Sequence, residues 1–281
     1  MRNLPHWLRK PVPKSQNIRE MRGLLKDDSV HTVCEGAKCP NIGECYSQKT
    51  VTFMILGETC TRSCRFCAVG KGSVVPPDKN EPKSVALAAK KLGLKYAVIT
   101  SVTRDDLDDG GASQFAETIK EIRSIMPGTK IEVLIPDFKG NEAALNIIVD
   151  IEPNIINHNL ETVPRLYSAV RPQADYKRSL NLLKTAKNHK NQLYTKSGIM
   201  VGLGETRPEV FGLMEDLRSV NCDILTIGQY LQPSKEQIGV AEFVDPAVFE
   251  EYRETGERLG FRKVFSAPFV RSSYKAGEIY V

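Results

Sequence analysis

Two groups of three cysteines stand in the first quarter of the chain. Cys60, Cys64 and Cys67 have the spacing C-x3-C-x2-C, and three cysteines upstream have the spacing C-x4-C-x5-C. Four thiolates are the usual ligand set for zinc or an iron–sulfur cluster, so each group is one ligand short. If such a group holds a cubane iron–sulfur cluster, one iron stays open to a substrate or cofactor. The spacing therefore predicts iron–sulfur chemistry at a site where a molecule can bind to iron directly.

A disulfide framework and a structural zinc site both agree less well with these cysteines. Disulfide frameworks are typical of small secreted domains, whereas this chain has 281 residues and begins without the apolar core of a signal peptide. Structural zinc sites prefer two C-x2-C pairs or a nearby histidine, and neither group supplies them. The seventh cysteine, Cys222, lies far from both groups and is interpreted as a small buried residue.

Three segments resemble those of known enzyme families. Residues 60–67, with Phe66 before the last cysteine, resemble the signature of the radical S-adenosylmethionine (SAM) enzymes. Residues 34–45 resemble the auxiliary-cluster motif of lipoyl synthases, and Arg-Ser-Ser-Tyr at 271–274 resembles a segment of the same family. The match runs from about Trp7 to the end of the chain, so it covers nearly the whole sequence.

The resemblance implies the role of the downstream group. Cys60, Cys64 and Cys67 would hold a 4Fe–4S cluster, and SAM would chelate its fourth iron. Electron transfer to the sulfonium of SAM would then give a 5′-deoxyadenosyl radical, which can take hydrogen from an unactivated carbon. These three cysteines are therefore expected to be catalytic.

The resemblance also implies a second, auxiliary 4Fe–4S cluster. Its ligands would be Cys34, Cys39 and Cys45 together with a serine of the 271–274 segment. Oxygen is a harder and more labile ligand for iron than a thiolate, as suits a cluster that is dismantled to give up sulfur. Ser273 is preferred to Ser272 as this ligand, although the sequence leaves both open.

In this family the reaction inserts two sulfur atoms at C6 and C8 of an octanoyl chain on a carrier lysine. The implied partners are octanoylated lipoyl carrier domains (2-oxoacid dehydrogenase E2 or glycine cleavage H protein), an electron donor such as ferredoxin or flavodoxin, and cluster-assembly proteins. A monomer is expected. Two alternatives remain: a different sulfur-inserting or methylthio-transferring radical enzyme, and a non-catalytic metal or redox-sensing module.

Composition limits the class of protein. A hydrophobic share of 41% is enough for an ordinary core, and no apolar run approaches the roughly 20 residues that cross a membrane. The net charge of +5 is mildly basic and suits an acidic protein partner, but no Lys/Arg run interleaved with aromatic residues indicates nucleic acid. Because metal-binding thiols stay reduced in the cytosol, a cytoplasmic location is expected.

The elements that must position these residues form an alternating series. Short, β-rich apolar runs are typical of parallel strands buried on both faces, and they occur at 51–56, 96–100, 130–135, 154–157, 198–201 and 224–227. Helices are predicted at 18–25, 82–92, 112–126, 178–188, 208–220 and 245–259, while residues 34–45 are expected to form a loop.

Six strand-then-helix units predict an α/β fold with a parallel sheet, a partial (β/α)6 TIM-like barrel as in the radical enzymes. In such folds the ligand site lies at the carboxyl ends of the strands, and residues 60–67 directly follow the first strand. We expect an N-terminal extension with the auxiliary motif (residues 1–50), the barrel (51–265) and a short C-terminal segment (266–281) that supplies the serine.

Polar residues after two predicted strands are candidates for contacts with SAM. Ser101 follows the second strand, where the family meets the methionine amine, and Asn159 and Glu161 follow the fourth. Arg171 or Arg178 could bind the carboxylate of the cofactor. The alternatives are a solvated acidic loop for the segment that follows Ser101, helix capping for Asn159 and Glu161, and surface exposure for the arginines. The histidine before Asn159 is interpreted as a packed residue.

Overall fold

The computed structural model describes residues 4–11, 15–27, 30–189 and 193–280. Residues 1–3, 12–14, 28 and 29 of the expected N-terminal extension, and residue 281 of the expected C-terminal segment, lie outside the described residues. No described helix is both long and apolar enough to cross a membrane.

The core is one sheet of seven strands in which every neighbouring pair is parallel. In sheet order the strands are β1 (Thr52–Ile55), β4 (Tyr96–Ser101), β5 (Lys130–Leu134), β6 (Ile155–Asn157), β7 (Tyr194–Val201), β8 (Ile224–Gln229) and β9 (Lys263–Ser266). All residues of β1, β6 and β8 are buried, as expected for strands covered on both faces. The six predicted strands are confirmed.

Strand β9 was not predicted. It pairs with β8 at the edge of the sheet, and of its four residues only Val264 is fully buried. An edge strand with one buried side chain lacks the continuous apolar run by which the other strands were recognised.

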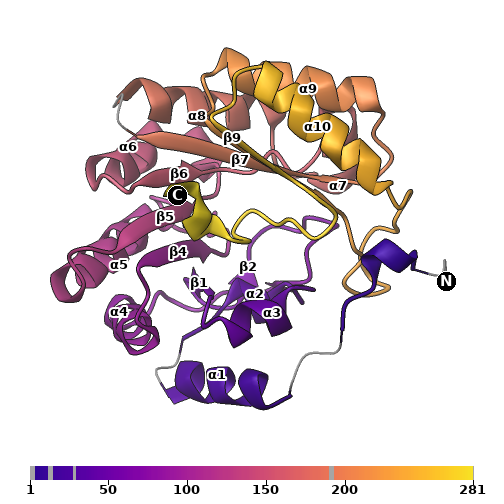
Figure 1. Ribbon diagram of the computed structural model, residues 1–281. Helices are drawn as coiled ribbons and strands as arrows, with labels where there is room; N and C mark the ends of the chain where they lie inside the picture. The colour runs from indigo at the N-terminus through magenta and orange to yellow at the C-terminus, as the bar shows by residue number, and fades with distance from the viewer. Residues whose placement is uncertain (1–3, 12–14, 28–29, 190–192, 281) are drawn as a thin grey trace.

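Six helices follow the first six strands of the sheet and pack around its outside (Figure 1). They are α4 (Glu81–Leu92), α5 (Ala112–Ile125), α6 (Glu142–Asp150), α8 (Tyr176–His189), α9 (Arg207–Ser219) and α10 (Pro246–Arg258). Five were predicted. The sixth, α6, was missed because it is short and its apolar run Leu-Asn-Ile-Ile-Val also suits a strand. The six strand–helix units confirm the partial-barrel class, and β9 adds a seventh strand.

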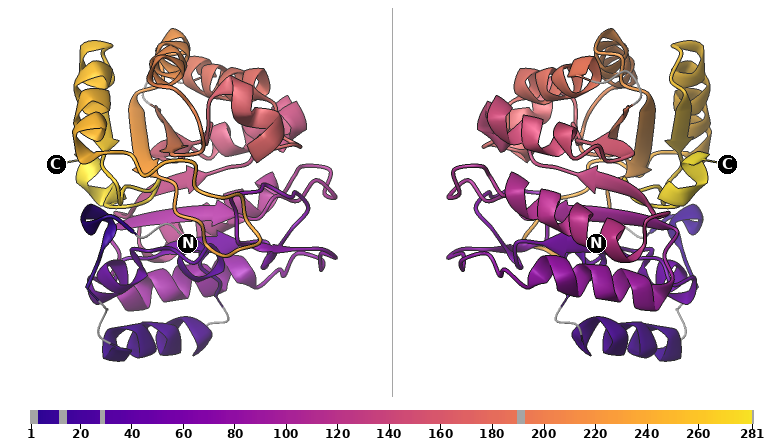
Figure 2. Two further views of the ribbon diagram at one scale, coloured as in Figure 1. Left: turned by 90° about the vertical axis from the view of Figure 1, so that its right-hand side faces the viewer. Right: turned by 90° about the vertical axis from the view of Figure 1, so that its left-hand side faces the viewer.

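The N-terminal part contains the helix predicted at 18–25, but residues 34–45 differ from the expected loop. It contains η1 (His6–Leu8), α1 (Ser15–Asp27), α2 (Val33–Gly36) and α3 (Ile42–Ser47). Cys34 therefore lies on α2 and Cys45 on α3, and only Cys39 lies between helices. The sequence hid α2 and α3 because each is under two turns long, although Thr32 does cap α2 by accepting a hydrogen bond from the Glu35 N–H at 3.4 Å. Helix α1 packs against α3 and α4 (Figure 2).

The C-terminal segment, residues 267–275, follows β9 and leads into η4 (Ala276–Tyr280), crossing the open side of the curved sheet (Figure 1). Two glycines in strand interiors allow it to lie close. A Cβ atom on Gly228 of β8 would be 2.0 Å from the Val270 carbonyl oxygen, and one on Gly198 of β7 would be 3.0 Å from the Ser272 Oγ. At Gly228 only glycine fits, because the backbone of another segment approaches the strand this closely, whereas the atoms nearest a Cβ on Gly198 belong to the Thr226 and Asn159 side chains.

The other short elements lie in connections at the rim. They are β2 (Thr59–Cys60), β3 (Gly70–Lys71), η2 (Phe138–Gly140), η3 (Pro164–Leu166) and α7 (Tyr167–Val170). Strand β2 follows β1 closely, so the 60–67 loop begins at the carboxyl end of the first strand, as predicted.

Candidate active site

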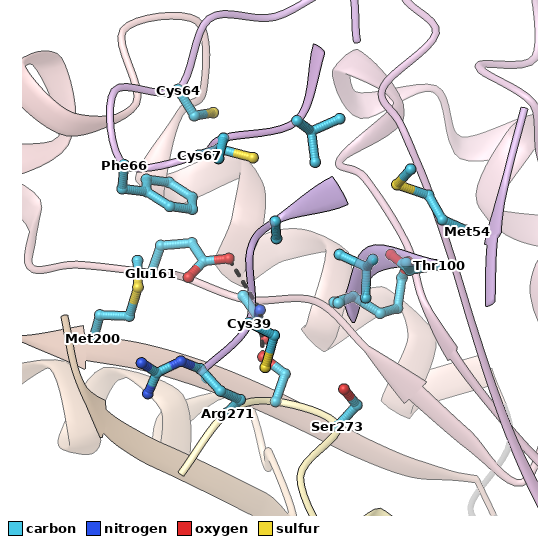
Figure 3. A pocket seen from close by; sticks show the side chains of 18 of the residues that line it. Cys39, Met54, Cys64, Phe66, Cys67, Thr100, Glu161, Met200, Arg271 and Ser273 are labelled. Carbon is cyan, nitrogen blue, oxygen red and sulfur yellow. Dashed lines mark hydrogen bonds between the residues drawn. The ribbon is translucent and has the colours of Figure 1, made fainter. Parts of the chain in front are cut away.

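A cavity of about 320 Å³ opens at the carboxyl ends of the strands. Its lining includes all three cysteines of the downstream group, two of the upstream group and residues 270–273 of the C-terminal segment. Figure 3 shows Cys64 and Cys67 on one side of the cavity, and Cys39, Arg271 and Ser273 on the other. Segments far apart in the sequence therefore share one site.

The loop that carries Cys60, Cys64 and Cys67 places its thiols among backbone N–H groups and buried surroundings. Cys60 Sγ accepts hydrogen bonds from the backbone N–H groups of Arg62 at 3.4 Å and Thr103 at 3.3 Å. Burial raises the pKa of Cys67 to about 12 and also raises the pKa of Cys64, although Arg171 opposes the latter effect. All three thiols are free of disulfide bonds and are therefore available to bind a metal cluster.

Arg62, inside this loop, anchors it to the rest of the barrel. Its guanidinium donates to both carboxylate oxygens of Asp105 at 2.7 and 2.9 Å and to Asp137 Oδ1 at 2.6 Å. Only 4% of the Arg62 side chain is exposed, and Asp137 is fully buried. Burial alone would raise the pKa of Asp137, but the hydrogen bond and charge of Arg62 outweigh it and lower the pKa to about 2. Sequence analysis had not singled out this network.

The upstream cysteines lie together behind the opposite wall. Cys34 and Cys39 line the cavity, whereas Cys45 does not. Burial raises the pKa of Cys34 to about 12, and the charges of Cys39 and Cys45 add to this rise. Within the described residues, no three or more His, Cys, Asp or Glu side chains are arranged to hold a single metal ion.

The two serines of the C-terminal segment have different surroundings. Ser272 Oγ accepts a hydrogen bond from Asn159 Nδ2 at 2.6 Å, and the same nitrogen donates to Glu161 Oε1 at 3.0 Å. Within the described part of the chain, the Ser273 hydroxyl has no hydrogen-bond partner, and Figure 3 places it on the same side of the cavity as Cys39. Ser273 thus has the free oxygen.

Four of the five residues predicted to contact SAM line the cavity: Ser101, Asn159, Glu161 and Arg171. Three of them carry a buried polar atom without a partner, namely Ser101 Oγ, Asn159 Oδ1 and Arg171 Nε. Buried polar atoms are almost always paired, so these atoms indicate a polar ligand. Arg178 is not part of the lining, and its guanidinium contacts Asp137 Oδ2 at 3.3 Å.

Two titratable side chains in the lining are Glu161, one of these four residues, and His158. Burial raises the pKa of Glu161, and Arg171 acts against that rise. His158, interpreted from sequence as a packed residue, is buried and its Nδ1 pairs with the Ile135 carbonyl at 2.8 Å, but it also lines the cavity with Nε2 unpaired. Burial lowers its pKa to about 4, so the imidazole is neutral at pH 7. Its position directly after β6 was the available signal.

The residues present fit the expected cofactors. Thiolates are the preferred ligands of iron–sulfur clusters, and the unpaired polar atoms at the strand ends suit the amine, carboxylate and ribose groups of SAM. A parallel partial barrel, with a C-x3-C-x2-C loop after its first strand that lines a cavity at the strand ends, defines a radical SAM enzyme.

Comparison with known proteins agrees with this class. Residues 54–217 match the radical SAM superfamily. Among solved structures, the fold is similar to HydG, a maturase of the [FeFe]-hydrogenase (TM-score 0.59, 13% identity, 89% of this chain and 63% of that one). It is also similar to methylornithine synthase (TM-score 0.57, 16% identity, 88% and 74%). At these identities the likeness concerns the fold alone.

Closer relatives identify the family. A lipoyl synthase of Caldicellulosiruptor saccharolyticus is 57% identical over 98% of this chain and 96% of its own length. Lipoyl synthases of Caldanaerobacter subterraneus (57%, 97% and 95%) and Azotobacter vinelandii (51%, 98% and 85%) are similar over comparable lengths. The chain belongs to the lipoyl synthase family. The expected enzyme class, a radical SAM sulfurtransferase with SAM and two 4Fe–4S clusters, is confirmed, and the two alternative classes are rejected.

Proposed function

We propose that the two walls of the cavity divide the work of lipoyl synthesis. Cys60, Cys64 and Cys67 would hold the cluster at which SAM is cleaved, and the upstream cysteines would hold the sulfur-donating cluster. When bound, these groups supply a radical that removes hydrogen from an alkyl carbon, and the sulfur that replaces it. The observation that carries this proposal is that both cysteine groups approach one cavity from separate parts of the chain.

The fourth ligand of the auxiliary cluster would be Ser273. Its hydroxyl is free and lies on the wall with Cys39, whereas the Ser272 oxygen is held by Asn159. Replacing Ser273 with Ala should therefore lower the iron retained by the upstream group. Replacing Ser272 with Ala should leave that iron in place.

SAM would lie against the strand ends. Ser101 and Asn159 would pair with its polar groups through their free oxygens, Glu161 would accept from its amine or ribose, and Arg171 would face its carboxylate. Arg178 is better suited to orient Asp137, and through it Arg62, than to touch the cofactor.

The substrate would be an octanoyl chain on a lysine of a lipoyl carrier protein, converted at C6 and C8. Apolar side chains that suit an alkyl chain line the same cavity: Val33, Met54, Val69, Leu134, Ile199 and Met200. The carriers would be E2 subunits or the H protein, with ferredoxin or flavodoxin as electron donor and cluster-assembly proteins as further partners. We place the enzyme, as a monomer, in the cytoplasm, where its seven free thiols stay reduced.

In this proposal residues 1–50 carry the auxiliary cysteines, residues 51–265 form the barrel and residues 266–281 supply the serine. The last strand of the sheet, β9, ends at Ser266, which supports the second boundary. Residues 34–47 contribute to the cavity wall without joining the sheet, which supports the first.

Anaerobic reconstitution tests the assignment. With reductant, SAM and an octanoyl-lysine peptide, the protein should bind about eight irons and yield 5′-deoxyadenosine and a dithiolated peptide. Cys39→Ala should still cleave SAM but insert no sulfur, whereas Cys64→Ala should do neither. Lipoyl product from Cys39→Ala would contradict the role given to the upstream cysteines.

A further inference from the structure

The two ends of the chain are joined beside the auxiliary cysteines. Glu44 of α3 receives a hydrogen bond from the Tyr274 hydroxyl on Oε1 at 2.5 Å and an ion pair from Lys10 Nζ on Oε2 at 2.8 Å. Lys10 Nζ also donates to Asn41 Oδ1 at 2.6 Å, and Asn41 Nδ2 donates to the Phe269 carbonyl at 2.7 Å. We call these five residues the clasp.

The clasp is a continuous contact rather than a single surface pair. Lys10 Nζ, which bonds to Asn41 and Glu44 near the upstream cysteines, also lies 4.4 Å from the ring centre of Phe269 and 5.6 Å from that of Tyr274 in the C-terminal segment. Asn41 is buried, and only 26% of the Lys10 side chain and 34% of the Glu44 side chain are exposed. Partial burial makes such charge-assisted bonds stronger than those of an exposed pair.

Two residues of the clasp are sequence neighbours of proposed ligands of the auxiliary cluster. Glu44 is the neighbour of Cys45, and Tyr274 is the neighbour of Ser273. The bond between Glu44 and Tyr274 therefore fixes the separation between a cysteine on α3 and the serine on the C-terminal segment. The sheet positions the C-terminal segment but not α3, because α3 lies outside the sheet, so contacts such as this bond set the separation.

We infer that the clasp is a positioning network for the auxiliary cluster: Lys10, Glu44 and Tyr274 hold Ser273 against the upstream cysteines. This inference rests on the proposed role of Ser273. A hydroxyl oxygen is a weak ligand for cluster iron, so its occupancy depends on how firmly its backbone is held at the ligand distance. Loosening the clasp lets Ser273 leave the iron more often and exposes the cluster to attack from solvent.

The test uses the rate at which a ferrous chelator removes iron from the auxiliary cluster. The downstream cysteines are changed to Ala in every protein, so that all bound iron reports on the upstream group. Tyr274→Phe should release iron about tenfold faster, which corresponds to about 1.4 kcal/mol. Tyr176→Phe is the matched control, since Tyr176 donates an equivalent bond to Asp216 Oδ2 at 2.7 Å on the outer helices, and its rate should not change.

A second pair of variants separates positioning from general stability. Lys10→Ala should accelerate iron release, and Lys10→Arg should restore the slow rate, while the thermal midpoint of the metal-free proteins stays within about 2 °C. If the parent holds its auxiliary iron and Tyr274→Phe releases it at the parent rate, the inferred role of the clasp is overturned and the proposed function stands. If the parent holds no auxiliary iron, the proposed function fails and the clasp fails with it.

Discussion

Adding one methyl group at Gly228 should detach the auxiliary side of the active site. The Cβ atom of Gly228→Ala would lie 2.0 Å from the Val270 carbonyl oxygen and 2.9 Å from its carbonyl carbon. Both are backbone atoms, so no side-chain rotation relieves the contact. Ordinary contacts begin at about 3.4 Å, so the C-terminal segment must move by more than 1 Å.

The C-terminal segment must move rather than β8, because β8 is paired with a strand on each side. Overpacking of this kind costs about 1–3 kcal/mol. The displaced segment also loses the hydrogen bond from the Gln229 N–H to the Pro268 carbonyl at 3.1 Å. Moving the segment carries Ser272 and Ser273 away from the cavity, while the loop with Cys60 keeps its anchors on Asp105 and Asp137.

The assay counts iron per chain after anaerobic reconstitution and measures 5′-deoxyadenosine and thiolated peptide. Gly228→Ala should keep about four of about eight irons through a chelator wash, retain most SAM cleavage and lose sulfur insertion. Gly212→Ala on α9 is the control, because a Cβ there meets nothing within 4 Å, and it should behave as the parent. Full iron and normal lipoyl product from Gly228→Ala would refute the reasoning.

Three further predictions concern the buried charges. Lys196→Met should lower the free energy of unfolding by about 3–5 kcal/mol in a urea titration, because it leaves the fully buried Glu132 without its cationic partner; Lys196→Met combined with Glu132→Gln should recover much of this loss. Arg62→Ala should destabilise the metal-free protein by a similar amount, about 3–5 kcal/mol, and should also abolish SAM cleavage. Asp137, whose pKa falls from 3.8 to about 2, adds about 2 kcal/mol above pH 4 that is lost as pH falls through 2; the unfolding free energy of Asp137→Asn should therefore show a correspondingly smaller acid dependence.

Much of the sheet was predictable because its strands are buried on both faces. Residues 96–100 and 224–227 are apolar runs of a length that suits only a strand, and the structure forms β4 and β8 there. The edge strand β9 and the short helix α6 were missed, since one has a single buried side chain and the other is short, with an apolar run that also suits a strand.

The candidate site was predictable for residues whose position follows from the order of the parallel strands along the chain. Ser101 ends β4 and Asn159 follows β6 of the same parallel sheet, so they reach the same edge, and the structure places both at the cavity. The partners of arginines were not predictable. Arg178 contacts Asp137, and Arg62 contacts residues 43 and 75 positions away, because several carboxylates were available and only the folded chain selects among them.

One signal in the sequence was available but not used. Gly198 and Gly228 interrupt strands that otherwise carry large side chains, and a glycine in a strand interior indicates that another backbone or a ligand approaches. Gly228 marks where the backbone of the C-terminal segment crosses β8, and Gly198 marks a point where the Thr226, Asn159 and Ser272 side chains meet. No local pattern in the C-terminal segment reveals this path.

The meeting of the two chain ends has a consequence for the order in which the enzyme matures. Asn41 and Phe269 are 228 positions apart, so the upstream cysteines emerge from the ribosome long before the segment that closes their site. By contrast, the 60–67 loop receives its last backbone hydrogen bond from Ile238, whose N–H donates to the Arg65 carbonyl at 2.9 Å. The residues given to the site that cleaves SAM, which extend to Arg171, and the bonds of its loop are therefore available before the C-terminal segment is made, whereas the sulfur-donating site can be completed only after translation has reached Tyr274.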